Sequence, residues 1–251
     1  MSGHSKWSTI KRKKGATDQK RGKIFSKLSK ELMVAARMGG GDPGGNARLR
    51  LAIQAAKAQS MPSDNIQRAI KKGTGELDGG QIEELSYEGY GPGGAAFIVD
   101  VATDNTNRSL NNVRNIFDKT GGKMAKPGAV AFQFERRGVV RFDSATHSED
   151  EVMEAALEAG AEDVVVEADA VLVYCGPTDL HEVAQGLQEA GLNAQETTFT
   201  MVPATTVAVE DVSVARTIIK LVDKLEDDDD VQNVWGNFEI LDDVAAQLEE
   251  D

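Results

Sequence analysis

The side chains best suited to chemistry in this chain are the lysines and arginines of its first 75 residues. That segment holds 17 of them against four acidic residues, whereas the rest of the chain holds 11 basic and 37 acidic residues. The net charge of −13 therefore averages two segments of opposite sign. Ammonium and guanidinium groups bind phosphate oxygens, whereas the acidic residues after position 75 are repelled by phosphates. The pattern therefore predicts a polyanionic partner, either DNA or ribosomal or messenger RNA. Sixteen side chains are the candidate nucleic-acid contacts: Lys6, Lys11, Arg12, Lys13, Lys14, Lys20, Arg21, Lys23, Lys27, Lys30, Arg48, Arg50, Lys57, Arg68, Lys71 and Lys72.

Aromatic side chains are scarce among these basic residues. Only Trp7 and Phe25 occur there, and the spacing of Phe25 places it on the apolar face of a predicted helix. This basic segment of residues 1–75, the basic head, therefore lacks a set of aromatic rings on which the bases of a single strand could stack. Its lysines and arginines are expected to contact phosphates, which positions a protein on nucleic acid without reading the sequence. The alternative is a helical domain that is simply rich in lysine.

Side chains that could build a catalytic or metal site are scattered. None of the three histidines, His4, His147 and His181, lies at ligand spacing from a cysteine or a carboxylate. The single cysteine, Cys175, falls in a strand-like apolar run, which predicts a buried thiol in a reducing compartment. We therefore expect no cofactor, no metal and no enzymatic activity.

Three short runs resemble functional motifs, but each fits a structural role better. Residues 89–94 satisfy G-x-G-x-x-G, yet a strand-like segment follows where a dinucleotide site needs a helix, so we expect a tight turn. Residues 227–230 are four consecutive aspartates without the spacing of a cation-binding loop, which predicts a solvated loop. Residues 129–134 resemble half of an RNA-recognition signature but lack its glycine and aromatic order, which predicts a core strand over residues 130–134.

Apolar periodicity predicts three helices that would position the basic residues. They cover about residues 18–38, 46–60 and 62–73, with a glycine-rich break at residues 39–45. In each helix the apolar side chains share one face, and the lysines and arginines lie opposite. The sequence thus predicts a basic arm over residues 1–17 and a basic three-helix domain over residues 18–75.

The pattern after residue 82 alternates between strands and helices. Residues 138–202 contain a complete β-α-β-β-α-β series, whereas residues 82–136 contain only its first half. Residues 205–240 supply the missing strand and helix signals. We therefore predict an α+β chain with two ferredoxin-like domains, one discontinuous over residues 82–136 and 203–245, and one inserted over residues 137–202. No apolar run is long enough for a membrane span, and the basic start lacks the apolar stretch of a secretory signal.

Several longer strings, spread over nearly the whole chain, match one protein family. They include Gly3-His4-Ser5-Lys6-Trp7, Arg21-Gly22-Lys23-Ile24-Phe25, Gly39-Gly40-Gly41-Asp42-Pro43, Tyr87-Glu88-Gly89-Tyr90-Gly91-Pro92-Gly93-Gly94 and Glu154-Ala155-Ala156-Leu157-Glu158-Ala159-Gly160-Ala161. Together these strings resemble the YebC/PmpR family. The resemblance implies three domains, no enzymatic activity, and a cytoplasmic DNA-binding regulator of transcription. It also implies an alternative, because related members act as translation factors that bind RNA or the ribosome.

Charge and resemblance together lead to one main hypothesis and one alternative. The main hypothesis is a non-enzymatic DNA-binding transcriptional regulator that uses its basic N-terminal domain. The alternative is a translational activator that binds ribosomal or messenger RNA, and charge alone does not separate the two because both partners present phosphates. An enzyme is the weakest hypothesis, because no convergent set of titratable residues is visible.

Overall fold

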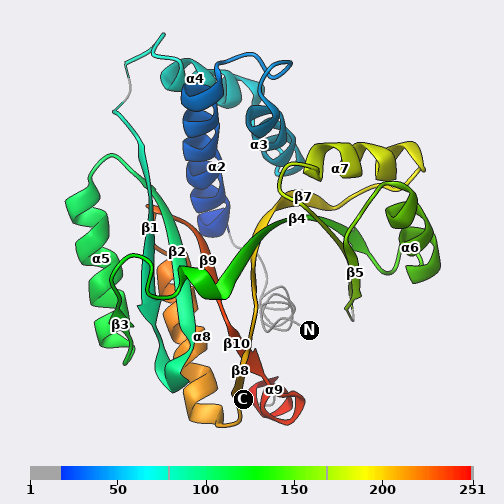
Figure 1. Cartoon of the computed structure of the whole chain (residues 1–251). Coiled ribbons are helices and arrows are strands. Elements are labelled where there is room, and N and C mark those ends of the chain that lie inside the picture. The colour runs from blue at the N-terminus through cyan, green and yellow to red at the C-terminus, as the bar shows by residue number, and fades with distance from the viewer. Residues whose placement is uncertain (1–17, 79, 168, 250–251) are drawn as a thin grey trace. The chain divides into compact units, whose positions relative to one another are not determined.

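The computed structural model describes residues 18–78, 80–167 and 169–249, with side chains from Gly22 to Leu248. Residues 134–204 form one compact unit, and the remainder of the described chain forms a second (Figure 1). Helices and largely antiparallel sheets occur in both α+β parts of the chain, so the predicted α+β class is confirmed. Within these described ranges, no helix is long and apolar enough to cross a bilayer.

Three helices begin the second unit and pack around a core of their own. They are α2 (Asp18–Gly39), α3 (Ala47–Ala58) and α4 (Ser63–Gly73). Leu32 and Leu49 are fully buried in this core, and Ile66 of α4 joins them. Burial of such side chains stabilises the domain by about 1.5–3 kcal/mol each. The three helices follow the apolar periodicity of the sequence, which confirms the prediction of helices in this region.

Asn46 connects the end of α2 to the start of α3. Its side-chain oxygen accepts a hydrogen bond from the Leu49 amide at 3.0 Å and so caps α3. Its amide nitrogen donates to the carbonyl oxygens of Ala35 at 2.7 Å and Gly40 at 2.8 Å, near the C-terminus of α2. One buried side chain thus satisfies backbone groups of both helices and fixes the glycine-rich connection.

The second unit also contains an antiparallel sheet with the order β3-β1-β2-β9. Its strands are β1 (Glu83–Tyr90), β2 (Ala96–Thr103), β3 (Lys123–Met124) and β9 (Val231–Gly236). Helices α5 (Thr106–Lys119) and α8 (Val212–Glu226) pack against it (Figure 1). Phe97 of β2, Phe117 of α5 and Leu221 of α8 are buried in the shared core. The predicted glycine turn between strands lies at residues 91–95 and contains the 3-10 helix η1 (Pro92–Gly94), whereas Gly89 and Tyr90 still belong to β1.

The C-terminal strands and helix of this unit differ from the prediction. The segment β8 (Val207–Val209) pairs in parallel with β10 (Phe238–Ile240) and forms a separate two-stranded sheet, whereas we expected it to join the antiparallel sheet. The chain then forms α9 (Asp242–Glu249), which the periodicity did not predict.

Residues 134–204 fold as a β-α-β-β-α-β unit. Its elements are β4 (Phe134–Asp143), α6 (Glu149–Glu158), β5 (Asp163–Val166), β6 (Ala170–Cys175), α7 (Leu180–Glu189) and β7 (Glu196–Pro203). The strands pair antiparallel in the order β5-β6-β4-β7, which is the ferredoxin-like arrangement. Cys175 is buried in β6, as predicted, and burial raises the pKa of its thiol to about 11.

The predicted core strand over residues 130–134 is wrong. Residues Ala131–Gln133 form the 3-10 turn η2, and β4 begins only at Phe134. The buried carboxylate of Glu88 accepts the amides of Val130 at 2.6 Å and Ala131 at 2.9 Å. Those amides are therefore unavailable to a strand ladder, because a side chain on β1 already binds them.

Candidate nucleic-acid interface

The sixteen predicted contacts fall into three groups in the structure. One group cannot be placed: Lys6, Lys11, Arg12, Lys13 and Lys14 lie outside the described residues, and the side chains of Lys20 and Arg21 lie outside the described side chains. Another group points to solvent from α3 and α4. The remaining group binds acidic groups of the same unit.

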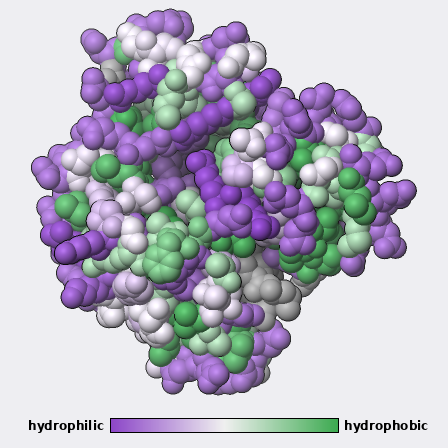
Figure 2. All heavy atoms as spheres, viewed as in Figure 1, coloured by the Kyte–Doolittle hydropathy of each residue, from purple (hydrophilic) through white to green (hydrophobic). Residues whose placement is uncertain are grey.

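Five basic side chains stand on the outer surface of α3 and α4. They are Arg50, Lys57, Arg68, Lys71 and Lys72, which we call the α3–α4 basic face. Arg50 is half-buried and the others are exposed. Within the described chain, no side chain of this face takes part in an ion pair or hydrogen bond. Hydrophilic residues cover much of the helical domain in this view (Figure 2).

Helix geometry brings these five charges together in two groups. Arg68, Lys71 and Lys72 are three and four residues apart on α4, which places them on one side of the helix. Arg50 and Lys57 are seven residues apart on α3, or about two turns. Like charges three or four residues apart, as on α4, repel each other by about 0.2–0.5 kcal/mol per pair. A bound phosphate chain would relieve that repulsion.

Three lysines of α2 instead bind the acidic run that follows α8. Lys23 Nζ donates to the Asp227 carboxylate at 2.9 Å and to its carbonyl oxygen at 3.0 Å. Lys27 Nζ donates to the Glu226 carbonyl oxygen at 3.0 Å, and Lys30 Nζ donates to the Asp229 carbonyl oxygen at 2.7 Å. The carbonyls of Glu226 and Asp227 lie at the C-terminal end of α8, the negative end of its dipole, where cations are favoured.

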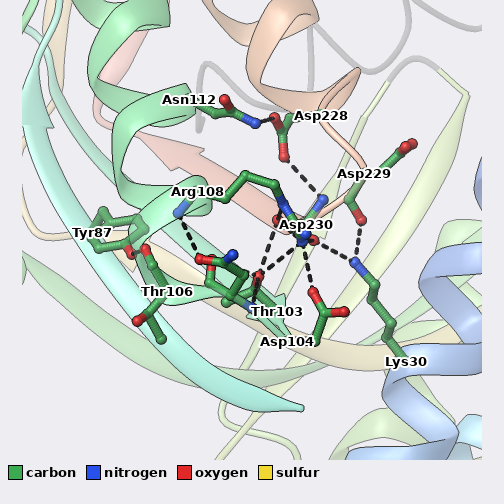
Figure 3. Close-up of polar contacts among 11 residues, drawn as sticks. Lys30, Tyr87, Thr103, Asp104, Thr106, Arg108, Asn112, Asp228, Asp229 and Asp230 are labelled. Carbon is green, nitrogen blue, oxygen red and sulfur yellow. Dashed lines mark hydrogen bonds and ion pairs between the residues drawn. The ribbon is translucent and has the colours of Figure 1, made fainter. Parts of the chain in front are cut away.

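Asp230 is the buried centre of these contacts (Figure 3). Its carboxylate accepts hydrogen bonds from Lys30 Nζ at 2.8 Å, Arg108 Nη2 at 2.8 Å and Thr103 Oγ1 at 3.0 Å. Burial alone would raise the pKa of Asp230, but its contacts with Lys30 and Arg108 outweigh burial and hold the pKa below its ordinary value. The prediction that residues 227–230 form a solvated loop is therefore wrong at Asp230, since two cations and a hydroxyl compensate its burial.

Arg48 links the helical domain to the sheet of the same unit. Its Nε and Nη2 donate to the two carboxylate oxygens of Glu31 on α2 at 2.8 and 2.9 Å. Its Nη1 donates to Glu84 on β1 at 3.0 Å. Burial alone would lower the pKa of Arg48, but the hydrogen bonds with Glu84 and Glu31 raise it above its ordinary value. This planar pairing of one guanidinium with two carboxylates gives Arg48 a structural partner.

Four of the sixteen predicted contacts, Lys23, Lys27, Lys30 and Arg48, thus have acidic or carbonyl partners inside the molecule. Sequence reasoning did not find the partners Glu84 and Asp230, or Arg108, which binds Asp230 beside Lys30. The only available signal was an acidic run directly after an amphipathic helix, opposite in sign to α2. Nothing in the spacing shows that two segments 200 residues apart meet. Across the described chain, no group of three histidine, cysteine or acidic side chains is arranged to hold a metal ion.

Comparison with known proteins places this architecture among related chains. Residues 5–76 match the model of the TACO1/YebC protein N-terminal domain, and residues 82–238 match that of the TACO1/YebC second and third domain. A probable transcriptional regulatory protein of Trichlorobacter lovleyi is 54% identical over 99% of this chain and 100% of its own length. One of the same description from Desulfotalea psychrophila is 52% identical, with both chains covered in full. The crystal structure of a conserved hypothetical protein from Aquifex aeolicus superposes with a TM-score of 0.86, at 46% identity, over 90% of this chain and 93% of that one.

Proposed function

The chain belongs to the TACO1/YebC family, and from that premise we propose that it is a non-enzymatic regulator of gene expression that binds nucleic acid in the cytoplasm. Relatives that match over their full length are named probable transcriptional regulatory proteins. Transcriptional regulation through DNA is therefore the first form of the proposal. The basic N-terminal domain supplies the contacts.

The observation that carries this proposal is the α3–α4 basic face. Its five cations have no internal counter-ion within the described residues, whereas Lys23, Lys30 and Arg48 each have one. Five phosphates bound there would give a slope of about −4.5 in log affinity against log salt concentration on duplex DNA. Affinity would then fall about 500-fold between about 50 and 200 mM salt.

The lysines that bind the acidic loop have a different part in this proposal. Lys23, Lys27 and Lys30 hold α2 against the end of α8, so their positive charge is used inside the unit. Together with Arg48 they position the helical domain on its own sheet. The phosphate contacts then come from α3, α4 and the basic residues near the start of the chain.

A translation factor that binds RNA or the ribosome is the second candidate. The same basic face also supports this candidate, because three of its five side chains are lysines: Lys57, Lys71 and Lys72. An ammonium group contacts a phosphate as a point charge and reads no base, which suits the backbone of ribosomal RNA as well as that of DNA.

A salt titration of matched variants of the full chain tests the proposal. Fluorescence anisotropy with a labelled DNA duplex would compare the wild type with an Arg68→Ala, Lys71→Ala, Lys72→Ala triple variant. We expect weaker binding and a salt slope smaller by about 3, because each lost phosphate contact removes about one unit. A Lys23→Ala, Lys27→Ala double variant is the control, and its slope should equal that of the wild type.

Equal slopes for the wild type and the triple variant would refute the basic face as the binding surface. Crosslinking in cells, followed by sequencing of the attached nucleic acid, separates the two candidate functions. Promoter DNA would support the transcriptional regulator. Ribosomal or messenger RNA would support the translation factor.

A further inference from the structure

Two aromatic side chains are exposed on the second unit, outside the helical domain. Phe132, in η2, is 77% exposed, and Tyr90, at the end of β1, is 40% exposed. The Tyr90 hydroxyl donates to the Ala129 carbonyl oxygen at 3.1 Å, so its ring extends along the segment that leads into η2. Aromatic side chains normally lose most of their exposed surface on folding, whereas Phe132 keeps most of its surface and Tyr90 keeps 40%.

The backbone that carries Phe132 is held rigidly. Glu88 accepts the amides of Gly128 at 2.5 Å, Val130 at 2.6 Å and Ala131 at 2.9 Å. Gly128 has a φ of +83°, in the left-handed region that favours glycine. Three hydrogen bonds to one buried carboxylate fix residues 128–131 directly before Phe132. The backbone that carries the exposed ring is therefore already ordered, which lowers the entropy lost when a partner binds.

The segment that leads from the end of α5 to Phe132 is basic, in contrast to the acidic remainder of the chain. Residues 119–134 contain three lysines and no acidic residue. Lys123 pairs with Tyr90 across β3 and β1. Lys126 begins the turn that Ala129 closes, and the Tyr90 hydroxyl binds the carbonyl oxygen of Ala129. Both lysines are exposed, and neither side chain has an ionic or hydrogen-bonding partner in the part of the chain that the structure describes.

We propose that Tyr90 and Phe132 form a stacking site for unpaired bases of single-stranded nucleic acid, with Lys123 and Lys126 binding the adjacent phosphates. Base stacking on an aromatic ring beside cationic side chains is the general chemistry by which proteins hold single strands. The proposal rests on the proposed nucleic-acid function and adds a second contact surface to it. It assigns a stacking site to the acidic part of the chain, whereas the sequence predicted phosphate contacts on the basic head alone.

Another exposed apolar side chain lies in an acidic surrounding and allows the effect of local charge to be tested. Leu157 of α6 is 76% exposed, about as much as Phe132. The same helix carries five acidic residues and no basic one, so a nucleic acid is repelled there. Leu157 therefore serves as a control position with equal exposure and opposite electrostatics.

The test measures single-strand and duplex affinity on the full chain. The probes are a labelled oligouridine RNA of about ten nucleotides, within the usual site size, and a labelled DNA duplex. For Phe132→Ala we expect roughly tenfold weaker binding to the oligouridine and an unchanged affinity for the duplex. Phe132→Trp should keep single-strand affinity, and its fluorescence should be quenched when a base stacks on the indole. Leu157→Ala should match the wild type on both probes.

The outcomes separate this inference from the function on which it rests. Unchanged oligouridine affinity in Phe132→Ala would overturn the stacking site, and if the α4 triple variant still weakened binding, the proposed function would stand. Equal losses on both probes would also overturn it, because stacking is specific to unpaired bases. A wild-type chain that binds neither probe would overturn both proposals. Since Phe132 is exposed, we expect all three variants to keep the thermal midpoint of the wild type, and circular dichroism checks this.

Discussion

Replacing Asp230 with asparagine should destabilise the second unit far more than the same change in a neighbouring aspartate. The Asp230 side chain is 5% exposed and binds Lys30 and Arg108, whose side chains are 17% and 46% exposed. Removing one partner of a fully buried ion pair costs about 3–5 kcal/mol. Because the two cations retain access to water, we expect a smaller loss of about 2–3 kcal/mol for Asp230→Asn.

Asp229→Asn is the matched control for this change. Asp229 belongs to the same acidic run and is exposed, and it contacts Lys30 only through its carbonyl oxygen. Its substitution should alter the free energy of unfolding by less than about 0.5 kcal/mol. Urea unfolding, followed by the fluorescence of Trp235 on β9 of the same unit, measures both variants. Equal effects of the two substitutions would refute the claim that Asp230 is a buried anchor.

The same carboxylate predicts a dependence of stability on pH. The pKa of Asp230 in the folded chain lies below its ordinary value, so the unfolded chain takes up a proton more readily as the pH falls. Its stabilisation is complete above the pKa of an unfolded aspartate, about 3.9, and is lost as the pH falls through the folded value. The difference in unfolding free energy between wild type and Asp230→Asn should therefore be largest above about pH 5 and shrink in acid. A difference that grows on acidification would contradict this assignment.

Two further predictions concern the helical domain. Arg48→Lys should lower the free energy of unfolding by about 1 kcal/mol, because an ammonium group cannot pair with Glu31 and Glu84 together in the planar geometry of a guanidinium. The same change should leave the salt slope of nucleic-acid binding unchanged. A reduced slope would show that Arg48 contacts phosphate. Gly73→Ala should destabilise the helical domain by about 1–3 kcal/mol, because a Cβ at this position would lie 2.3 Å from the Met33 carbonyl oxygen and force α4 away from α2. A thermal midpoint equal to that of the wild type would show that the two helices can separate without a cost in free energy.

Local patterns were sufficient to predict most of the secondary structure. The three basic helices, the series between residues 138 and 202, and the glycine turn between β1 and β2 all follow from apolar spacing and glycine placement. The prediction was wrong at residues 130–134, where the run of apolar residues predicted a strand. A carboxylate on β1, some 42 residues earlier, takes the amides that a strand would have used. A periodicity argument does not include such a distant hydrogen-bond acceptor.

The sequence by itself determined the separation of charge, the α+β class and the family of this protein, because each of these depends on residue type and order along the chain. Only the tertiary structure decided which cations remain available. Lys30 and Lys71 are both lysines on amphipathic helices, and the sequence does not distinguish them. In the structure, Lys30 binds a buried aspartate 200 residues away, whereas Lys71 faces solvent on α4. The physical reason is that a charge is compensated by whatever lies within a few ångströms of it, and folding sets those distances independently of separation along the chain. In the same way, folding buried Glu88 and left Phe132 exposed.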